Sequence, residues 1–174
     1  ASTKAYTSQV CLIAILGMYF AETMGSYPED KIEELKHSIL DLPSKIEAVL
    51  DESEKIKDFA DKVYTQKDMF FLGRGTDYDV ALEGSLKLKE ISYIHSEAYA
   101  AGELKHGPIA LIENGVIVIG IITNKNLVEK TISNIQEVIT RGAKTLIITN
   151  QILPNNNFGY VINIPETNEL ISPI

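Results

Sequence analysis

Residues 69–73 read Met-Phe-Phe-Leu-Gly, and a longer apolar run, Val-Ile-Val-Ile-Gly-Ile-Ile, follows at residues 116–122. Short continuous apolar runs, rich in β-branched residues and bounded by glycine, are typical of strands buried on both faces of a parallel sheet. Two further runs of this kind lie at residues 145–148 and 160–164. The sequence therefore predicts four buried strands in the C-terminal part of the chain.

Helical periodicity fills the remaining segments. Residues 79–94 and 126–140, between the first three strands, carry apolar side chains at helical spacing, and so do residues 7–64. Alternation of strands and helices indicates parallel strands joined by right-handed crossovers. We expect an α/β fold, a three-layer sandwich with a parallel sheet flanked by helices, preceded by a helical N-terminal segment.

A single domain over residues 1–174 is the expected organisation. Its helical lead-in would extend to about residue 66, and its sheet-bearing core would start at about residue 67. Because the chain begins without an initiator methionine, it reads as part of a larger protein.

Composition restricts the classes of partner. The net charge is −8, and no basic segment is present to neutralise phosphates, which argues against nucleic acid but permits a small anionic substrate. The lone Cys11 and the scattered His37, His95 and His106 predict neither a disulfide framework nor a metal site. No signal peptide is recognisable, and the apolar stretch Val10–Phe20 looks too short to span a bilayer, so we expect a cytoplasmic protein without a membrane partner.

Charged residues share one face of the helix predicted at 79–94. Glu83, Lys87 and Glu90 are spaced by four and three residues. Spacing alone favours an ordinary solvated ion pair. The functional alternative is a carboxylate base beside an ammonium group, which could remove a proton next to a carbonyl and stabilise the developing oxyanion.

Two loops also carry candidate chemistry. Residues 73–77, Gly-Arg-Gly-Thr-Asp, join a strand to a helix, where glycines permit a tight turn and a helix N-terminus favours an anion. A plain strand-to-helix turn is the favoured interpretation. His106 lies in a polar turn before Gly107 and Pro108, and is either a surface histidine or a near-neutral imidazole suited to sugar ring opening.

A long motif covers the same region. Residues 71–75 read FLGRG, and residues 81–108 read ALEGSLKLKEISYIHSEAYAAGELKHGP. Together with the opening ASTKAYTSQ, this sequence resembles the second sugar-isomerase (SIS) domain of the glutamine:fructose-6-phosphate amidotransferase family, almost residue for residue between residues 71 and 111.

The resemblance implies an activity and a set of roles. Family members convert fructose 6-phosphate and glutamine-derived ammonia into glucosamine 6-phosphate, without metal or organic cofactor, as dimers that also contain a first SIS domain and an N-terminal glutaminase domain. Glu90 would shuttle the proton between C1 and C2, and Lys87 would lie near the open-chain oxygens. His106, from the neighbouring subunit, would open the ring, and Ser2 would line the sugar pocket.

Parts of the family pattern are missing from this sequence. It contains no cysteine glutaminase, no Ser/Thr-rich phosphate loop of the first SIS domain and no C-terminal tail with an imine-forming lysine, so we expect the chain alone to turn over little or no substrate. The alternatives are a non-catalytic phosphosugar-binding SIS regulatory module, an aldose–ketose isomerase acting without amination, and a structural dimerisation domain.

Overall fold

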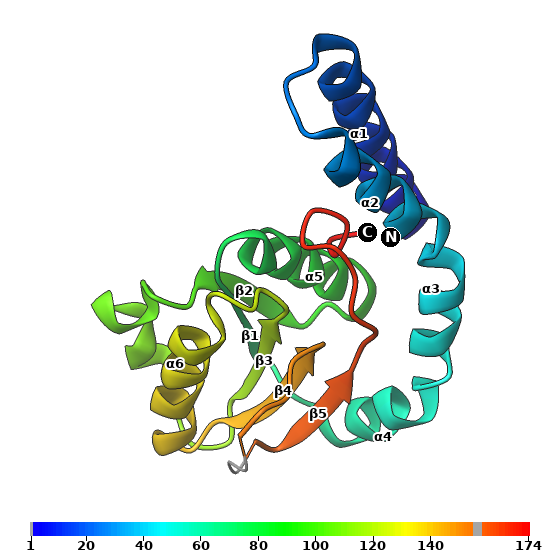
Figure 1. Ribbon diagram of the computed structural model, residues 1–174. Helices are drawn as coiled ribbons and strands as arrows, with labels where there is room; N and C mark the ends of the chain where they lie inside the picture. The colour runs from blue at the N-terminus through cyan, green and yellow to red at the C-terminus, as the bar shows by residue number, and fades with distance from the viewer. Residues whose placement is uncertain (1, 155–157) are drawn as a thin grey trace. The chain divides into compact units, whose positions relative to one another are not determined.

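The computed structural model describes residues 2–154 and 158–174, which form two compact units (Figure 1). One unit combines the N-terminal helices, up to residue 51, with residues 165–174. The other unit comprises residues 52–164 and contains the sheet.

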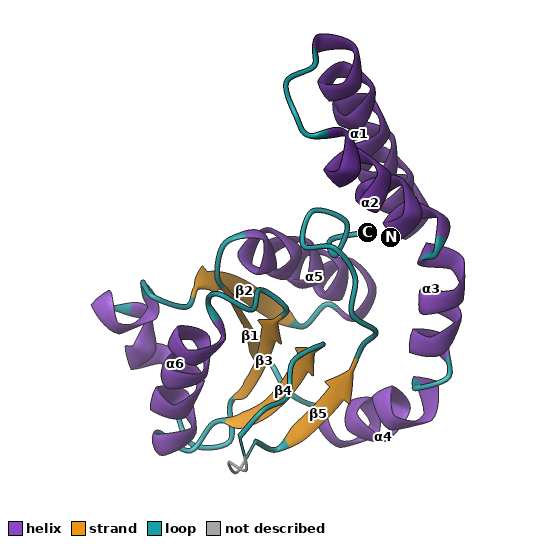
Figure 2. Cartoon of the chain, viewed as in Figure 1, coloured by secondary structure: helices purple, strands orange, loops and turns teal. Residues whose placement is uncertain are grey.

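The sheet is five-stranded and parallel, with the strand order β2-β1-β3-β4-β5 (Figure 2). Its strands are β1 (Asp68–Gly73), β2 (His95–Ala100), β3 (Ile117–Ile122), β4 (Lys144–Thr149) and β5 (Tyr160–Asn163). The four predicted strands are confirmed. The sequence analysis missed β2, because this edge strand reads His-Ser-Glu-Ala-Tyr-Ala and has no continuous apolar run.

Helices cover both faces of the sheet. On one face, α4 (Ser53–Val63) and α5 (Thr76–Ser92) pack on a cluster that includes Phe71. On the other face, α6 (Val128–Thr140) and the 3₁₀ turn Leu104–His106 pack on a cluster that includes Phe70. Successive strand side chains point to opposite faces, so an apolar strand fills both clusters. The expected three-layer α/β fold is confirmed.

The helical unit consists of α1 (Thr3–Met24), α2 (Glu29–Leu40) and α3 (Leu42–Leu50) with the C-terminal residues. Ile32, Leu35 and Ile171 are its buried apolar side chains among the described residues. A hydrogen bond from the Tyr6 hydroxyl to the Pro173 carbonyl, 3.3 Å, ties α1 to the C-terminal segment.

Several apolar positions of this unit face outward. The apolar residues Ile32, Leu35 and Leu40 predict one inner face for α2, and this is wrong for Leu40, which is the last residue of the helix and is 74% exposed. Ile46 and Leu50 of α3 are exposed as well. Helical periodicity identifies the apolar stripe of each helix but does not say that a neighbour covers it.

Helix α1 is longer than the apolar stretch on which the membrane expectation rests. The helix continues through the polar residues before Val10 to reach 22 residues, and by length and composition alone it could cross a membrane. Length and composition are weak criteria for a single helix near the N-terminus, since helices that pack against protein also meet them.

The boundaries between the two compact units lie at residues 51/52 and 164/165, whereas the predicted boundary between lead-in and core lies at about residue 66. Helix α4, predicted as lead-in, groups with the sheet, and residues 165–174, predicted as core, group with the first helices. That the whole chain is one SIS domain stays a prediction. Residues 154–157 read Pro-Asn-Asn-Asn, which predicts a polar loop, and only Pro154 of it belongs to the described residues.

Candidate functional site

The carboxyl ends of β1 and β3 mark the point at which ligands bind in open parallel sheets, because the strand order reverses between these two strands. The loop after β1 is only Arg74 and Gly75, with Gly75 at φ 59°. A Cβ on Gly73 would lie 2.4 Å from the backbone carbonyl of Asp77, so only glycine permits this turn.

A carboxylate of the chain itself occupies this edge. The Asp77 side chain accepts hydrogen bonds from the Thr123 N–H at 2.9 Å, the Asn124 N–H at 3.4 Å and the Thr123 hydroxyl. Asp77 is only 3% exposed. The anion held at the predicted glycine loop is therefore internal, which agrees with the interpretation of residues 73–77 as a strand-to-helix turn.

The charged stripe of α5 is a three-residue cluster. Lys87 Nζ lies 2.9 Å from Glu90 Oε2 and 3.2 Å from Glu83 Oε1. The Lys87 side chain is 17% exposed and Glu90 is 39% exposed, so the ammonium lies deeper than the carboxylate that reaches solvent. One α-helical turn thus presents a base and a cation side by side, as the spacing predicts.

The ion pair changes the acidity of both groups. The hydrogen bond from Lys87 lowers the pKa of Glu90, and the same bond raises the pKa of Lys87, with Glu83 adding to the effect. At neutral pH, Glu90 is therefore an ionised carboxylate, ready to accept a proton, beside a fully charged ammonium.

His106 ends the 3₁₀ turn Leu104–His106 and is exposed. Its backbone N–H donates to the Glu103 carbonyl at 3.0 Å, and the Leu104 side chain is fully buried beneath the turn. Within residues 52–154 and 158–164, its imidazole contacts neither Lys87 nor Glu90 through a hydrogen bond or ion pair. The structure therefore does not bring the predicted histidine to the predicted base within one chain.

Ser2 belongs to the helical unit and precedes α1 as its N-cap residue. Its carbonyl accepts a hydrogen bond from the Tyr6 N–H at 3.2 Å, whereas its side chain makes no capping hydrogen bond. The side chain is exposed. Because Ser2 and Glu90 lie in different units, its assignment to the sugar pocket stays a prediction.

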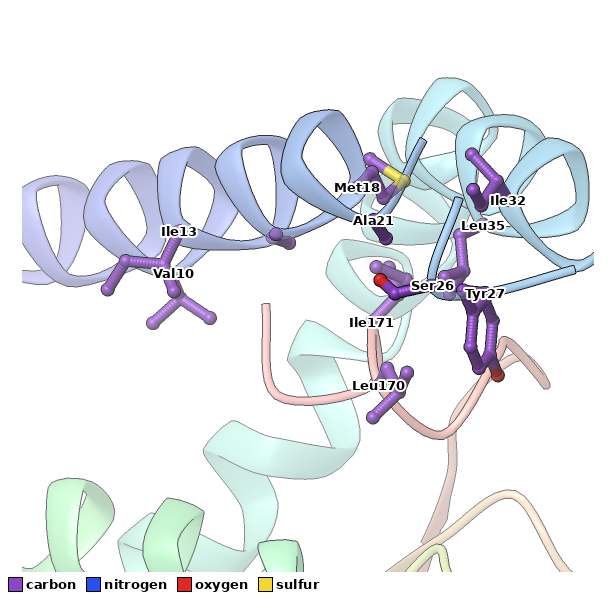
Figure 3. A pocket seen from close by; sticks show the side chains of 12 residues that line it. Val10, Ile13, Met18, Ala21, Ser26, Tyr27, Ile32, Leu35, Leu170 and Ile171 are labelled. Carbon is purple, nitrogen blue, oxygen red and sulfur yellow. The ribbon is translucent and has the colours of Figure 1, made fainter. Parts of the chain in front are cut away.

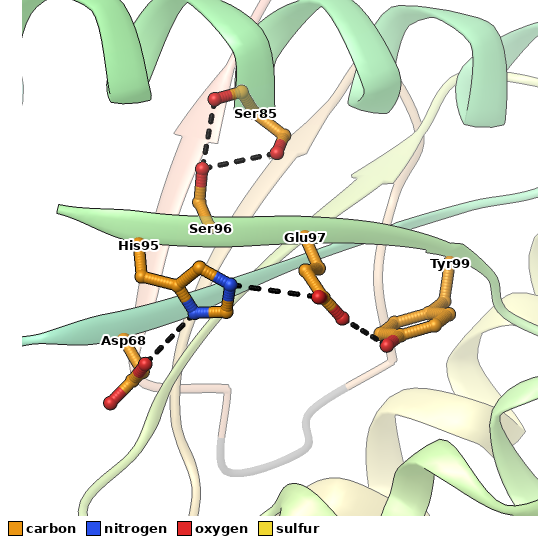
Figure 4. A network of polar contacts seen from close by, with 6 residues as sticks. All are labelled: Asp68, Ser85, His95, Ser96, Glu97 and Tyr99. Carbon is orange, nitrogen blue, oxygen red and sulfur yellow. Dashed lines mark hydrogen bonds and ion pairs between the residues drawn. The ribbon is translucent and has the colours of Figure 1, made fainter. Parts of the chain in front are cut away.

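A polar network lies along the missed strand β2 (Figure 4). His95 Nδ1 lies 2.9 Å from Asp68 Oδ1, and its Nε2 lies 3.5 Å from Glu97 Oε1. The Tyr99 hydroxyl donates to Glu97, and this hydrogen bond raises the pKa of Tyr99 to about 12. The sequence analysis gave His95 no role, and only the pairing of β2 with β1 places it opposite Asp68.

The helical unit has an apolar cavity of about 400 Å³ (Figure 3). It is lined by α1, α2, Ser26, Tyr27, Leu170 and Ile171. Its walls carry no acid or base other than the Tyr27 phenol, so they offer apolar contact rather than catalysis. In residues 2–154 and 158–174, no group of three His, Cys, Asp or Glu side chains is arranged to hold a metal ion.

The five-stranded parallel sheet between two helical layers is the fold of a SIS domain. The sequence profile described as "SIS domain" matches residues 62–156, and the chain belongs to this family. It is 53% identical over its full length to the glutamine–fructose-6-phosphate aminotransferase (isomerizing) of Clostridium perfringens, and 39% identical to that of Thermococcus kodakarensis. The resemblance seen in the sequence is thereby confirmed. The chain spans 29% of the length of these two relatives.

A solved structure gives the same answer for the fold. The C-terminal domain of glucosamine–fructose-6-phosphate aminotransferase from Francisella tularensis aligns with 99% of this chain at a TM-score of 0.94 and 34% identity. The chain covers 50% of that structure. It therefore matches about half of a C-terminal domain in a longer aminotransferase.

Proposed function

We propose that this chain is the second SIS domain of a glutamine–fructose-6-phosphate aminotransferase, which converts fructose 6-phosphate and ammonia from glutamine into glucosamine 6-phosphate and water. The observation that carries the proposal is the Lys87–Glu90 ion pair of α5, in a chain that resembles aminotransferases along its whole length. A regulatory module that only binds a phosphosugar would need no base beside a cation.

The α5 cluster suits the isomerisation step. After the open-chain ketose has formed an imine at C2, one base must take a proton from C1 and return it at C2. The ionised Glu90 carboxylate reaches solvent and can take that proton. The adjacent Lys87 ammonium offsets negative charge that develops on the substrate oxygens. No metal or organic cofactor is needed for this transfer.

The remaining assignments concern the assembled protein. His106 serves ring opening at the active site of a partner subunit in a homodimer, and this agrees with its exposure and its lack of contact with Glu90. Ser2 contributes to the sugar pocket. A first SIS domain holds the phosphate, an N-terminal glutaminase domain supplies ammonia, and α1 packs against protein in a cytoplasmic enzyme rather than in a membrane. The chain alone turns over little or no substrate.

The test compares two carboxylates that share one lysine. In the full-length protein, Glu90→Gln should lower ammonia-dependent synthesis of glucosamine 6-phosphate by about 100-fold or more, with fructose 6-phosphate binding intact. Glu83→Gln is the matched control, because Glu83 also pairs with Lys87, and it should keep most of the activity.

Two results would contradict the proposal. Unchanged activity in Glu90→Gln would show that the α5 cluster is an ordinary solvated ion pair without a catalytic role. Binding of fructose 6-phosphate by the unmodified protein, with no product from ammonia, would instead favour the regulatory module.

A further inference from the structure

Arg74 is a half-buried cation at the carboxyl end of β1. Among the described residues it forms no ion pair, although the chain is strongly acidic. Its Nε and Nη2 both donate to one acceptor, the Asn134 side-chain oxygen, at 3.3 and 2.8 Å. Asn134 is a buried residue of α6, so the guanidinium is held in a fixed orientation at the carboxyl end of β1.

The Arg74 guanidinium packs against the turn that follows β2. A Cβ on Gly102 would lie 2.8 Å from Arg74 Nη2, which means that the backbone of Gly102 rests directly on the guanidinium. The preceding residue is tied down as well, since the Ala101 N–H donates to the Gly73 carbonyl at 2.9 Å. The start of the turn is therefore held at two adjacent residues, Ala101 by Gly73 and Gly102 by Arg74.

The same turn carries His106. The Glu103 N–H donates to the Ala100 carbonyl at 2.8 Å, Leu104 is fully buried, and His106 follows at the end of the 3₁₀ turn. This segment connects β2 to β3 in the chain, and Figure 1 shows it (green) beside the sheet rather than within it. The orientation of an exposed imidazole thus depends on how firmly the base of the turn is held.

We propose that Arg74, oriented by Asn134, is a positioning residue that holds the Gly102–His106 turn and so places the His106 imidazole for ring opening. The proposal rests on the proposed function, because only an active His106 gives the position of this turn a kinetic consequence. In this role Arg74 supports the isomerase reaction through the position of the turn and not by binding the sugar.

The experiment is a double-mutant cycle in the full-length protein, measuring kcat/KM for fructose 6-phosphate with ammonia. His106→Ala should lower kcat/KM about 100-fold and Arg74→Met about 10-fold. If Arg74 acts through His106, adding Arg74→Met to His106→Ala should cost less than 2-fold more.

Matched variants separate position from folding. Asn134→Leu removes the acceptor at similar volume and should reproduce the loss of Arg74→Met, whereas Asn134→Asp keeps the acceptor and should stay within 2-fold of the unmodified protein. Arg141→Met makes the same chemical change at an exposed site and should have no effect. Asn134→Leu also provides the cycle if Arg74→Met does not fold.

Contrary outcomes identify which inference fails. If the losses of Arg74→Met and His106→Ala multiply, Arg74 acts independently of His106 and the positioning role is wrong, while the proposed function stands. If His106→Ala leaves kcat/KM unchanged, the ring-opening role of His106 in the proposed function fails, and the positioning role fails with it.

Discussion

At the scale of single residues, the α5 cluster is the feature that short-range spacing predicts best. Glu90 keeps a lowered pKa because Lys87 donates to it. In Lys87→Met the pKa of Glu90 should rise toward its ordinary value, and the acidic limb of the pH–rate profile should move to higher pH. An NMR titration of the Glu90 side chain measures the shift, and an unchanged pKa would contradict the role given to the ion pair.

Tyr99 gives a prediction for alkaline pH. Its pKa is raised from 10.0 to about 12 by the hydrogen bond to Glu97, so the neutral phenol is favoured in the folded state. The stability that it contributes is fully present below pH 10 and is lost as the pH rises through about 12. Tyr99→Phe should lower the free energy of unfolding by about 1 kcal/mol at neutral pH.

The pH dependence distinguishes this effect from lost packing. Unfolding midpoints should fall more steeply between pH 10 and 12 in the unmodified chain than in Tyr99→Phe. Tyr93→Phe is the control, because Tyr93 is almost fully exposed, and it should follow the unmodified chain. Parallel curves for all three proteins would show that the Tyr99 hydroxyl does not carry the linkage.

At the scale of elements, the β1–α5 turn depends on a glycine. A Cβ on Gly73 would meet the backbone of α5 at 2.4 Å, so Gly73→Ala should destabilise the sheet-bearing unit by about 3 kcal/mol. Gly17 of α1 has no neighbour within 4 Å of the same position, so Gly17→Ala should be neutral or stabilise by up to about 1 kcal/mol. Chemical denaturation measures both, and equal effects would contradict the steric argument.

Features that depend on residues close together in the sequence could be predicted, and features that depend on distant residues could not. Strands β1, β3 and β4 are recognisable because they are buried on both faces, and β5 is recognisable from its apolar run although it is only partly buried. Strand β2, with its exposed His95, has no apolar run. The Lys87–Glu90 pair was recognisable because both residues lie on one helix. The contact of Arg74 with Asn134 joins residues 60 positions apart, and sequence spacing carries no information on it.

At the scale of the whole molecule, both buried clusters of the sheet lie within one unit. Every side chain of the two clusters falls between Phe59 and Ile164. Residues 52–164 should therefore fold without the helical unit and unfold in one cooperative transition. Calorimetry of this segment tests the prediction, and a broad transition without a heat-capacity peak would show that the sheet needs the helices.

The discontinuous helical unit has a consequence for synthesis. Its first helices leave the ribosome before the sheet-bearing unit, but Ile171 and Pro173, which contact them, are made after that unit. At a translation rate of about 10 residues per second, the interval is on the order of 10 s. The sheet-bearing unit can form in that time, while the apolar side of α1 still lacks its contacts with residues 165–174. We expect nascent chains stopped before residue 165 to be bound by chaperones through α1.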